Sequence, residues 1–200
     1  MTPIARRLRS AASRDEGLSM AELLVYSVLL GGVLLLVGSL LINSLRTERT
    51  VTTVVDATTS AQLATRSIDG AIRNSSGFVL TPVAPSDQVL LARVSNEDGV
   101  YRCVAWYYSD SEATIRTTSS PTKILPVAWA TSADRASWTL LAEGVEPAVD
   151  KASTAPILAV SGTSSSMVKL DFRVLAGDHP PATISSSVAV RLTEASTQCW

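Results

Sequence analysis

The chain has 200 residues, of which 46% are hydrophobic and 18% are charged. This composition is too apolar for an intrinsically disordered protein, and the length allows one domain of ordinary size with additional segments. The formal net charge of −1 argues against a broad basic surface that binds nucleic acid. The charge is uneven, because four arginines lie within the first 17 residues, whereas residues 75–200 carry nine basic and twelve acidic side chains.

A long uncharged segment follows the basic N-terminus. Residues 23–45 contain no Asp, Glu, Lys or Arg, and as a helix they would span about 35 Å, which is enough to cross a hydrocarbon core about 30 Å thick. The positive-inside rule predicts that the N-terminus lies in the cytoplasm and that residues 46–200 lie outside it. The basic residues that support this orientation are Arg6, Arg7, Arg9 and Arg14.

A secretory signal peptide and a plain membrane anchor each account for only part of the pattern around residues 23–45. A removable secretory signal peptide has a shorter apolar region followed by an Ala-x-Ala-like cleavage site, whereas this segment continues through GSLLINSL with no such site nearby. A plain single-span anchor fits the length, but it assigns no role to Glu22, a lone carboxylate directly before the apolar residues. Chance placement stays open as an alternative, since an acid at the edge of a span costs less than one at its centre.

The stretch GLSMAELLVYSVLLGGVLLL, residues 17–36, resembles the N-terminal signature of type IV prepilins and pseudopilins. In that family a prepilin peptidase cleaves directly after the glycine, the new N-terminal residue is N-methylated, and a glutamate is the fifth residue of the mature chain. The resemblance implies cleavage between Gly17 and Leu18, methylation of Leu18, and an assembly role for Glu22. The chain departs from many family members in its acidic pair Asp15-Glu16 and in having Leu18 rather than phenylalanine.

The spacing between Leu18 and Glu22 has a physical explanation. Cleavage after Gly17 creates a cationic α-amine on Leu18, and Glu22 lies about one helical turn further on. In a stack of helices, the Glu22 carboxylate of one chain can meet the Leu18 ammonium of a neighbour. Because an unpaired charge in an apolar environment is costly, this pairing favours docking and fixes its register.

The resemblance also implies an organisation and a set of partners. Residues 1–17 would be a cytoplasmic leader that is removed, 18–45 a transmembrane and assembly half of a long helix, 46–74 its amphipathic half, and 75–200 a β-rich head. The implied partners are other pilin-like subunits, the prepilin peptidase, membrane lipid, and an inner-membrane assembly platform with its ATPase. No cofactor and no direct contact with nucleic acid are expected. The head would be extracytoplasmic before assembly and part of an envelope or cell-surface filament afterwards.

Residues 46–74 carry one narrow apolar stripe. Its members recur at intervals of three and four, which predicts a helix that packs closely on a sheet or on another helix. They are Val54, Ala57, Ala61, Ala64, Ile68 and Ala71. No proline interrupts the segment, and the cluster Asn74-Ser75-Ser76-Gly77 is typical of a helix C-terminus.

From residue 78 onward, prolines punctuate the chain and β-branched residues become frequent. We expect a hairpin from residues 88–94 and 100–108 with its turn at 96–99, and further strands at 113–118, 167–175 and 182–192. In residues 167–175 the apolar side chains alternate with charged ones, as in a half-exposed antiparallel strand. Residues 137–145 are predicted to form a loop with a short strand. The overall prediction is an α+β fold in which a long N-terminal helix packs on an antiparallel β-sheet head.

The stretch WTLLAEGVEPAV, residues 138–149, supports a narrower resemblance. Together with the preceding hairpin and the terminal SVAVR, it is similar to a subclass of larger minor pilins related to a tip pseudopilin of type II secretion. The resemblance implies a minor pilin or pseudopilin.

The sequence offers little for catalysis. It contains no Cys-x-x-Cys, His-Glu-x-x-His, phosphate-binding loop or nucleophile elbow. The one histidine, His179, is expected in a solvated loop at 177–181, and Asp178 beside it has no array of further metal ligands. Aromatic residues such as Trp106, Tyr107 and Trp138 are expected to supply core rather than a binding surface. We therefore expect neither an enzyme nor a metal site.

Two cysteines lie in the part predicted to be extracytoplasmic, where disulfides persist. Cys103 falls within a predicted strand and Cys199 is the penultimate residue. An intramolecular bridge is favoured, and pilins often tether their C-terminal region in this way. Two buried thiols, or an interchain link through Cys199, are the alternatives.

A function of a different class also fits these features. A single-pass receptor or adhesin would expose a β-rich binding domain and never polymerise. It predicts that Met1–Gly17 is retained and that Glu22 is dispensable.

Overall fold

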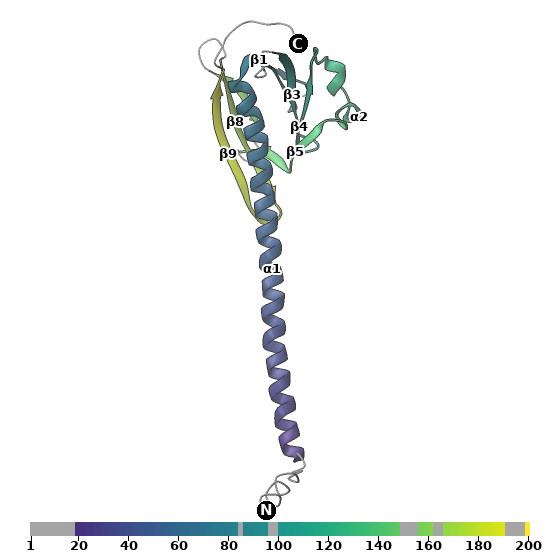
Figure 1. Cartoon of the computed structure of the whole chain (residues 1–200), viewed down its shortest axis with the longest axis vertical. Coiled ribbons are helices and arrows are strands. Elements are labelled where there is room, and N and C mark those ends of the chain that lie inside the picture. The colour runs from purple at the N-terminus through teal and green to yellow at the C-terminus, as the bar shows by residue number, and fades with distance from the viewer. Residues whose placement is uncertain (1–18, 84–85, 96–99, 149–155, 162–165, 191–198) are drawn as a thin grey trace, which may run out of the picture. The chain divides into compact units, whose positions relative to one another are not determined.

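The computed structural model describes residues 19–83, 86–95, 100–148, 156–161, 166–190 and 199–200. The contacts within the chain separate into two compact units, Met1–Glu48 and Arg49–Trp200, which we call the N-terminal unit and the head. The described part of the N-terminal unit is almost entirely helical, and the head is an α+β structure (Figure 1). The predicted α+β class is confirmed.

Helix α1 runs from Met20 to Arg73 as a single element of 54 residues. Its end follows from local hydrogen bonds: the Asn74 side-chain amide donates to the Gly70 carbonyl at 2.9 Å and the Ser75 hydroxyl to the Ile72 carbonyl at 2.8 Å. These side chains satisfy carbonyls that have no partner in the last turn of a helix. The predicted stop at Asn74 is confirmed. The residues after it do not form a loop, because strand β1 begins directly at Ser75.

Sheet A contains five antiparallel strands in the order β1-β2-β3-β4-β5 (Figure 1). They are β1 (Ser75–Pro82), β2 (Gln88–Ser95), β3 (Tyr101–Ser109), β4 (Thr114–Ser120) and β5 (Thr139–Glu143). The predicted hairpin is β2 and β3, in register from Gln88 opposite Tyr108 to Ser95 opposite Tyr101. Its turn at 96–99 lies outside the described residues. The strand predicted at 113–118 is β4.

Sheet B is built on a long central strand. Its members are β6 (Val145–Pro147), β7 (Leu158–Ser161), β8 (Met167–Ala176) and β9 (His179–Ala189). Strands β6 and β7 pair with different parts of β8, and β9 pairs with β8 as well. The strand predicted at 167–175 is β8, and its apolar positions Val168, Leu170, Phe172 and Val174 are all buried.

Two predictions for the chain from residue 137 onward were wrong in detail, and one strand was missed. Residues 137–145 hold β5 and the start of β6 rather than one short strand, and β7 was not predicted. Strand β9 begins at His179, three residues earlier than predicted, so His179 pairs with Ala176 instead of lying in a loop. The turn before β9 is this short because Gly177 has a φ of 61°, which glycine adopts at no steric cost.

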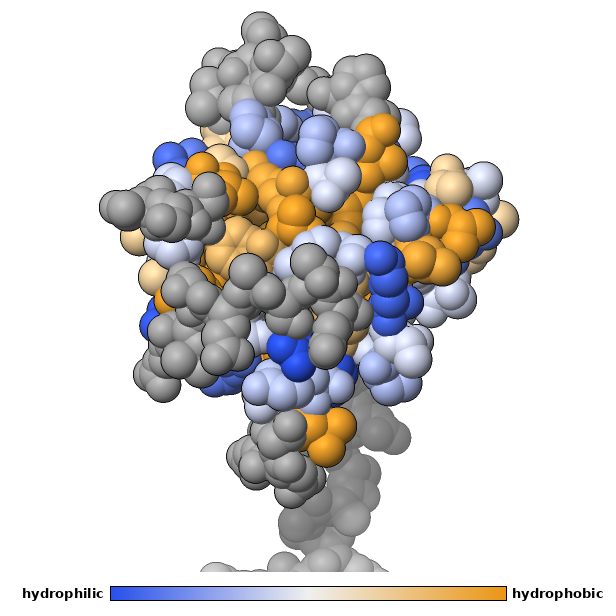
Figure 2. Space-filling model, turned by 90° about the horizontal axis from the view of Figure 1, so that it is seen from above, coloured by the Kyte–Doolittle hydropathy of each residue, from blue (hydrophilic) through white to orange (hydrophobic). Residues whose placement is uncertain are grey.

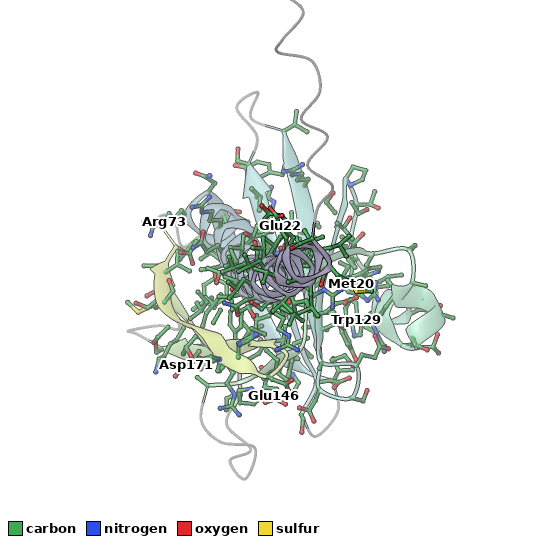
Figure 3. The ribbon with its side chains drawn as sticks, turned by 90° about the horizontal axis from the view of Figure 1, so that it is seen from below. Met20, Glu22, Arg73, Trp129, Glu146 and Asp171 are labelled. Carbon is green, nitrogen blue, oxygen red and sulfur yellow. A yellow bond between two sulfur atoms is a disulfide. The ribbon has the colours of Figure 1, made fainter. Side chains whose placement is uncertain are left out.

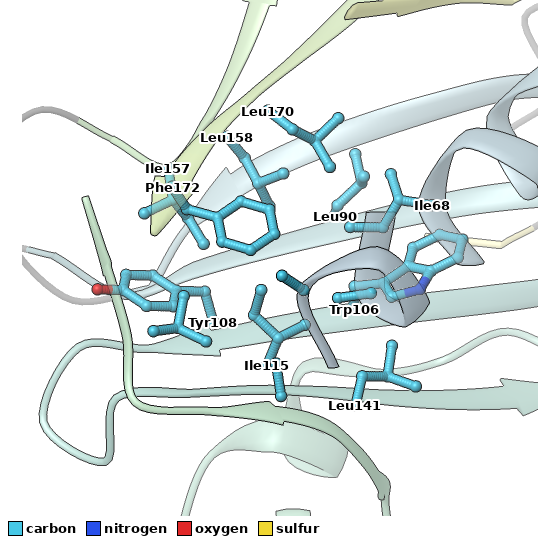
Figure 4. Close-up of a cluster of buried hydrophobic side chains, with 14 of the residues drawn as sticks. Ile68, Leu90, Trp106, Tyr108, Ile115, Leu141, Ile157, Leu158, Leu170 and Phe172 are labelled. Atoms are coloured by element: carbon cyan, nitrogen blue, oxygen red, sulfur yellow. The ribbon is translucent and has the colours of Figure 1, made fainter. Parts of the chain in front are cut away.

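The main core of the head lies between α1, sheet A and sheet B. Figure 4 shows Ile68 of α1, Leu90 and Trp106 of sheet A, and Leu170 and Phe172 of sheet B meeting in one cluster. The predicted stripe is confirmed in large part. Ala57, Ala61, Ala64 and Ile68 are buried, while Val54 and Ala71 are partly buried against the cluster. Ile72, one turn beyond Ile68, is also fully buried.

A second cluster covers the opposite face of sheet A. The 3₁₀ helix η1 (Pro126–Trp129) and the short helix α2 (Ser132–Arg135) lie on this side. Trp129 and Trp138 from this segment pack with Val89, Leu91 and other residues of sheet A. The sequence signal for α2 was Thr131-x-x-Asp134, which forms a capping box with both of its hydrogen bonds present. The expectation that the aromatic residues supply core is confirmed for Trp106, Tyr107, Tyr108, Trp129 and Trp138.

Gln88 links the two sheets of the head. Its side-chain amide donates to the Leu158 carbonyl at 2.8 Å and accepts from the Leu158 N–H at 3.0 Å. This buried side chain therefore supplies both hydrogen bonds that a neighbouring strand would otherwise give to the start of β7. It holds β7 of sheet B against β2 of sheet A.

Candidate functional site

The first turn of α1 carries the predicted assembly residue. Ser19 precedes the helix, and its hydroxyl oxygen accepts a hydrogen bond from the Glu22 backbone N–H at 3.2 Å. This contact satisfies one of the N–H groups that have no partner within the helix, as expected for an N-cap residue. Glu22 therefore occupies the third position of the helix, where the helix dipole favours a negative charge. Figure 3 labels Met20 and Glu22 at this end of α1.

A hydroxyl one turn away orients the Glu22 carboxylate. The Tyr26 hydroxyl donates to Glu22 Oε1 at 3.2 Å, and both side chains lie on the exposed surface of the helix. Residues four apart face the same side of a helix, so Tyr26 can hold one carboxylate oxygen while the other stays accessible. Tyr26 was not predicted from the sequence, although it lies four residues after Glu22, the spacing of neighbours on one face of a helix.

The rest of the N-terminal unit presents apolar side chains around the whole circumference of the helix. Large side chains from Leu23 to Leu45 are between 48% and 78% exposed. The hydroxyls of Ser27 and Ser39 donate to the carbonyls of Leu24 and Leu36, both at 2.8 Å, so these polar groups need no partner outside the helix. This part of α1 is long and apolar enough to cross a membrane by length and composition.

Three glycines in this unit leave gaps in the apolar surface. A Cβ atom added to Gly31, Gly32 or Gly38 would meet nothing within 4 Å. The helix surface at these positions is therefore open to a close neighbour, as small residues are in membrane helix contacts.

Gly17 and Leu18, the predicted cleavage and methylation residues, lie outside the described residues. Cleavage after Gly17, methylation of Leu18 and the pairing of Glu22 with a neighbouring amine stay predictions. The same holds for the leader at 1–17.

The predicted disulfide is confirmed. Cys103 and Cys199 are bonded to each other with a Cα–Cα distance of 5.4 Å and a sequence separation of 96 residues. The backbone N–H of Ile124 donates to the Cys199 carbonyl at 3.3 Å, and all three residues belong to the second core cluster. The bridge thus fixes the C-terminus to β3 and to the segment that covers sheet A. An extracytoplasmic head is consistent with this disulfide and the membrane-capable helix.

The head also holds an aromatic and charged cluster that was not predicted from the sequence. The Arg135 guanidinium lies 4.3 Å from the centre of the Tyr107 ring, donates to the Trp129 carbonyl at 2.9 Å, and pairs with Glu112 at 3.2 Å. The Tyr107 hydroxyl donates to Asp87 at 2.5 Å. Burial, and then the hydrogen bond to Asp87, raise the pKa of Tyr107 above its ordinary value of 10.0. A phenol kept protonated in this way serves structure, as a donor between β3 and Asp87.

Within the described ranges, no group of three or more His, Cys, Asp or Glu side chains is arranged to hold a metal ion. Asp178 lies in the turn between β8 and β9, and His179 is the first residue of β9. No nucleophile with an adjacent base emerges from the head's described contacts.

Comparison with known proteins finds no matching family model, no matching curated protein and no matching solved structure. The pilin-like architecture, an apolar N-terminal helix continuing into a head where it packs on antiparallel sheets, stands on the structure itself.

Proposed function

We propose that this chain is a structural subunit, a minor pilin or pseudopilin, of a type IV pilus-like filament. It is inserted into the membrane as a precursor, cut after Gly17 and methylated on Leu18. It is then drawn into a filament by an assembly platform and its ATPase. The head remains extracytoplasmic throughout.

The observation that carries the proposal is the surface of the N-terminal unit. Apolar side chains are exposed on every side from Leu23 to Leu45, and the first turn holds a single carboxylate, Glu22, oriented by Tyr26. A span that only anchors the head needs the apolar surface but not the acid. A span that docks against other helices uses both, because the carboxylate meets the amine of Leu18 on a neighbour and the apolar surface packs against other spans.

The proposal assigns the partners as well. The prepilin peptidase cleaves the precursor, and the lipid bilayer surrounds its apolar span before assembly. Other pilin-like subunits contact the helix after assembly. Residues 75–200, which make up the head beyond α1, are mildly acidic and give no basis for direct binding of nucleic acid.

Substitution of Glu22 tests this proposal. In cells that assemble the filament, Glu22→Gln keeps the size and the helix position of the side chain but removes its charge. We expect normal membrane insertion and cleavage, and strongly reduced recovery of the variant in sheared filaments. Tyr26→Phe is the matched control, because it keeps the charge and loses only the hydroxyl, so its incorporation should fall much less.

The alternative receptor or adhesin makes the opposite prediction. If Glu22→Gln is recovered in filaments as efficiently as the wild type, the proposed charge pairing is wrong. If the wild-type chain never enters filaments and keeps Met1–Gly17, the receptor or adhesin is the better description.

A further inference from the structure

A groove on the head lies where α1 passes between the two sheets. Its walls come from α1, from β5 of sheet A and from β8 of sheet B, and its volume is about 400 Å³. Ala57, Leu141, Ala142 and Val174 give it an apolar floor, and these residues also belong to the main core. The floor is therefore fixed by the fold rather than by mobile side chains.

Two exposed leucines form part of the rim. Leu140 on β5 is 37% exposed and Leu175 on β8 is 44% exposed. On β8 the earlier outward positions are Lys169, Asp171 and Arg173, as expected for a face in water. At Leu175 the pattern changes to a large apolar side chain, beside the groove. Exposed apolar patches rimmed by polar residues are typical of binding grooves.

The same rim carries two carboxylates. Asp56 of α1 and Glu143 of β5 line the groove and are both exposed. The ion pairs found among the described side chains include neither of them. The groove thus combines an apolar floor with an acidic rim, so its occupant should offer apolar and basic side chains on one face. Figure 2 shows the head from above, where hydrophobic side chains extend across the middle of the face between hydrophilic ones.

The chain itself carries a segment of this chemistry. Ile42, Leu45, Arg46 and Arg49 follow one another at intervals of three, one and three residues in α1, so they lie on one face of the helix. Ile42 and Leu45 are 54% and 48% exposed. This face, which we call the exit stripe, is apolar in its first half and doubly basic in its second half.

We propose that the groove binds the exit stripe of a second copy of this chain. Leu45 packs against Leu140 and Leu175, while Arg46 and Arg49 lie near Asp56 and Glu143. This inference rests on the proposed function, because filament assembly is what brings several copies of α1 together. The inference adds a claim to the proposed function: two copies of this subunit are direct neighbours in the filament. A subunit present as a single copy would have no such neighbour. Such charge pairs at a rim contribute orientation and specificity more than affinity.

Disulfide cross-linking of full-length chains tests the contact. Leu175→Cys in one copy and Leu45→Cys in a differently tagged copy are produced together in cells that assemble the filament. The native cysteines are already paired with each other. We expect several-fold more covalent heterodimer from this pair than from Lys169→Cys with Leu45→Cys. Lys169 is a matched control, because it lies on the same outward face of β8 and is also exposed.

Charge reversal tests the acidic rim. Adding Asp56→Arg and Glu143→Arg to the Leu175→Cys copy should reduce the heterodimer several-fold, and adding Arg46→Glu and Arg49→Glu to the Leu45→Cys copy should restore it. Asp171→Arg, on β8 outside the groove, should leave the yield unchanged.

The outcomes separate the two proposals. Equal cross-linking at Lys169, or no response to charge reversal, overturns the groove contact. If the subunit is cleaved and enters filaments but Leu175→Cys cross-links only to a different subunit, the second copy is the wrong occupant and the proposed function stands. If the wild-type chain is neither cleaved nor incorporated, the proposed function fails and the groove contact fails with it.

Discussion

Glu22 makes two local contacts that together determine how its carboxylate is presented. Its backbone N–H is bound by the Ser19 hydroxyl, and its Oε1 accepts from the Tyr26 hydroxyl. Together they hold the Glu22 side chain in the first turn of the helix, where the helix dipole favours a negative charge. The pairing of this carboxylate with the amine of Leu18 on a neighbouring chain stays part of the proposed function.

Tyr107 occupies the opposite kind of environment, inside the head. Its ring packs edge to face with Trp138, with 6.4 Å between the ring centres, and its hydroxyl binds Asp87. Asp87 also accepts from the backbone N–H of Asp110 at 2.9 Å. An ionised phenolate would lie in direct contact with the Asp87 carboxylate. Burial is the largest cause of the raised pKa of Tyr107, and it also raises the pKa of Tyr108.

This environment predicts a loss of stability at alkaline pH. Unfolded tyrosine ionises near pH 10, and the pKa of Tyr107 is higher in the folded head, so the unfolded state binds fewer protons above that pH. The stability contributed by the phenol is complete below about pH 10 and is lost as the pH rises toward the folded pKa.

Tyr107→Phe should therefore make the free energy of unfolding fall less steeply between about pH 9 and pH 11. Denaturant unfolding of the full chain in detergent, followed by tryptophan fluorescence, measures this, since all four tryptophans lie in the head. Tyr101→Phe is the control, because Tyr101 is 42% exposed. An unchanged slope in Tyr107→Phe would contradict the account.

At the scale of elements, the disulfide and the segment that holds η1 and α2 lie on the same face of sheet A. Cys103 lies in β3, and Cys199 contacts Ile124 just before η1. The bridge closes most of the head into one loop of 96 residues. In the chain-entropy model such a loop stabilises by about 4–5 kcal/mol.

Removing the bridge should accordingly cost several kcal/mol. We expect Cys103→Ser with Cys199→Ser to lower the free energy of unfolding by about 4 kcal/mol. Reduction of the wild type under non-denaturing conditions should lower its melting temperature in parallel. A loss below about 1 kcal/mol, smaller than the usual range for a native bridge, would mean that the second core cluster holds the C-terminus without it.

The alanines of α1 set how closely the helix approaches the sheets. Ala61 and Ala64 have no exposed surface, and larger side chains would force the helix away from Leu90 and Trp106. Ala64→Leu should destabilise the head by about 1–3 kcal/mol, the usual cost of overpacking. Thr59→Leu, on the exposed side of the same helix, should change the free energy of unfolding by less than about 0.5 kcal/mol. Equal effects of the two substitutions would contradict the packing described.

Elements with a long periodic pattern were predictable, and short ones were not. The apolar stripe of α1 and the alternation in β8 extend over ten residues or more, so their periods are distinct. β6 and β7 have three and four residues, too few to define a period, and their pairing comes from β8 and Gln88. β1 was missed because its Ser-Ser-Gly start is also typical of a helix end. The sequence singled out Glu22 by its spacing to Gly17, and its role in assembly stays a prediction. The groove could not be predicted, since it joins α1, β5 and β8 across long stretches of chain.

At the scale of the whole molecule, the two units have different requirements. The head buries its own apolar side chains in two clusters. In the N-terminal unit, large apolar side chains are exposed on every side, so lipid or other helices must cover them. A single carboxylate at the start of such a helix is costly in lipid and useful between helices. This difference supports an assembly role for the N-terminal unit, to which the head adds the contact proposed at its groove.

Mass analysis of the N-terminus of the protein isolated from membranes tests the central claim most directly. The proposal predicts a mature chain that begins at Leu18, lacks residues 1–17 and carries one added methyl group on its α-amine. Production in cells without prepilin peptidase should leave the leader in place. A chain from peptidase-containing cells that still begins at or near Met1, with an unmodified Leu18, would contradict the proposal.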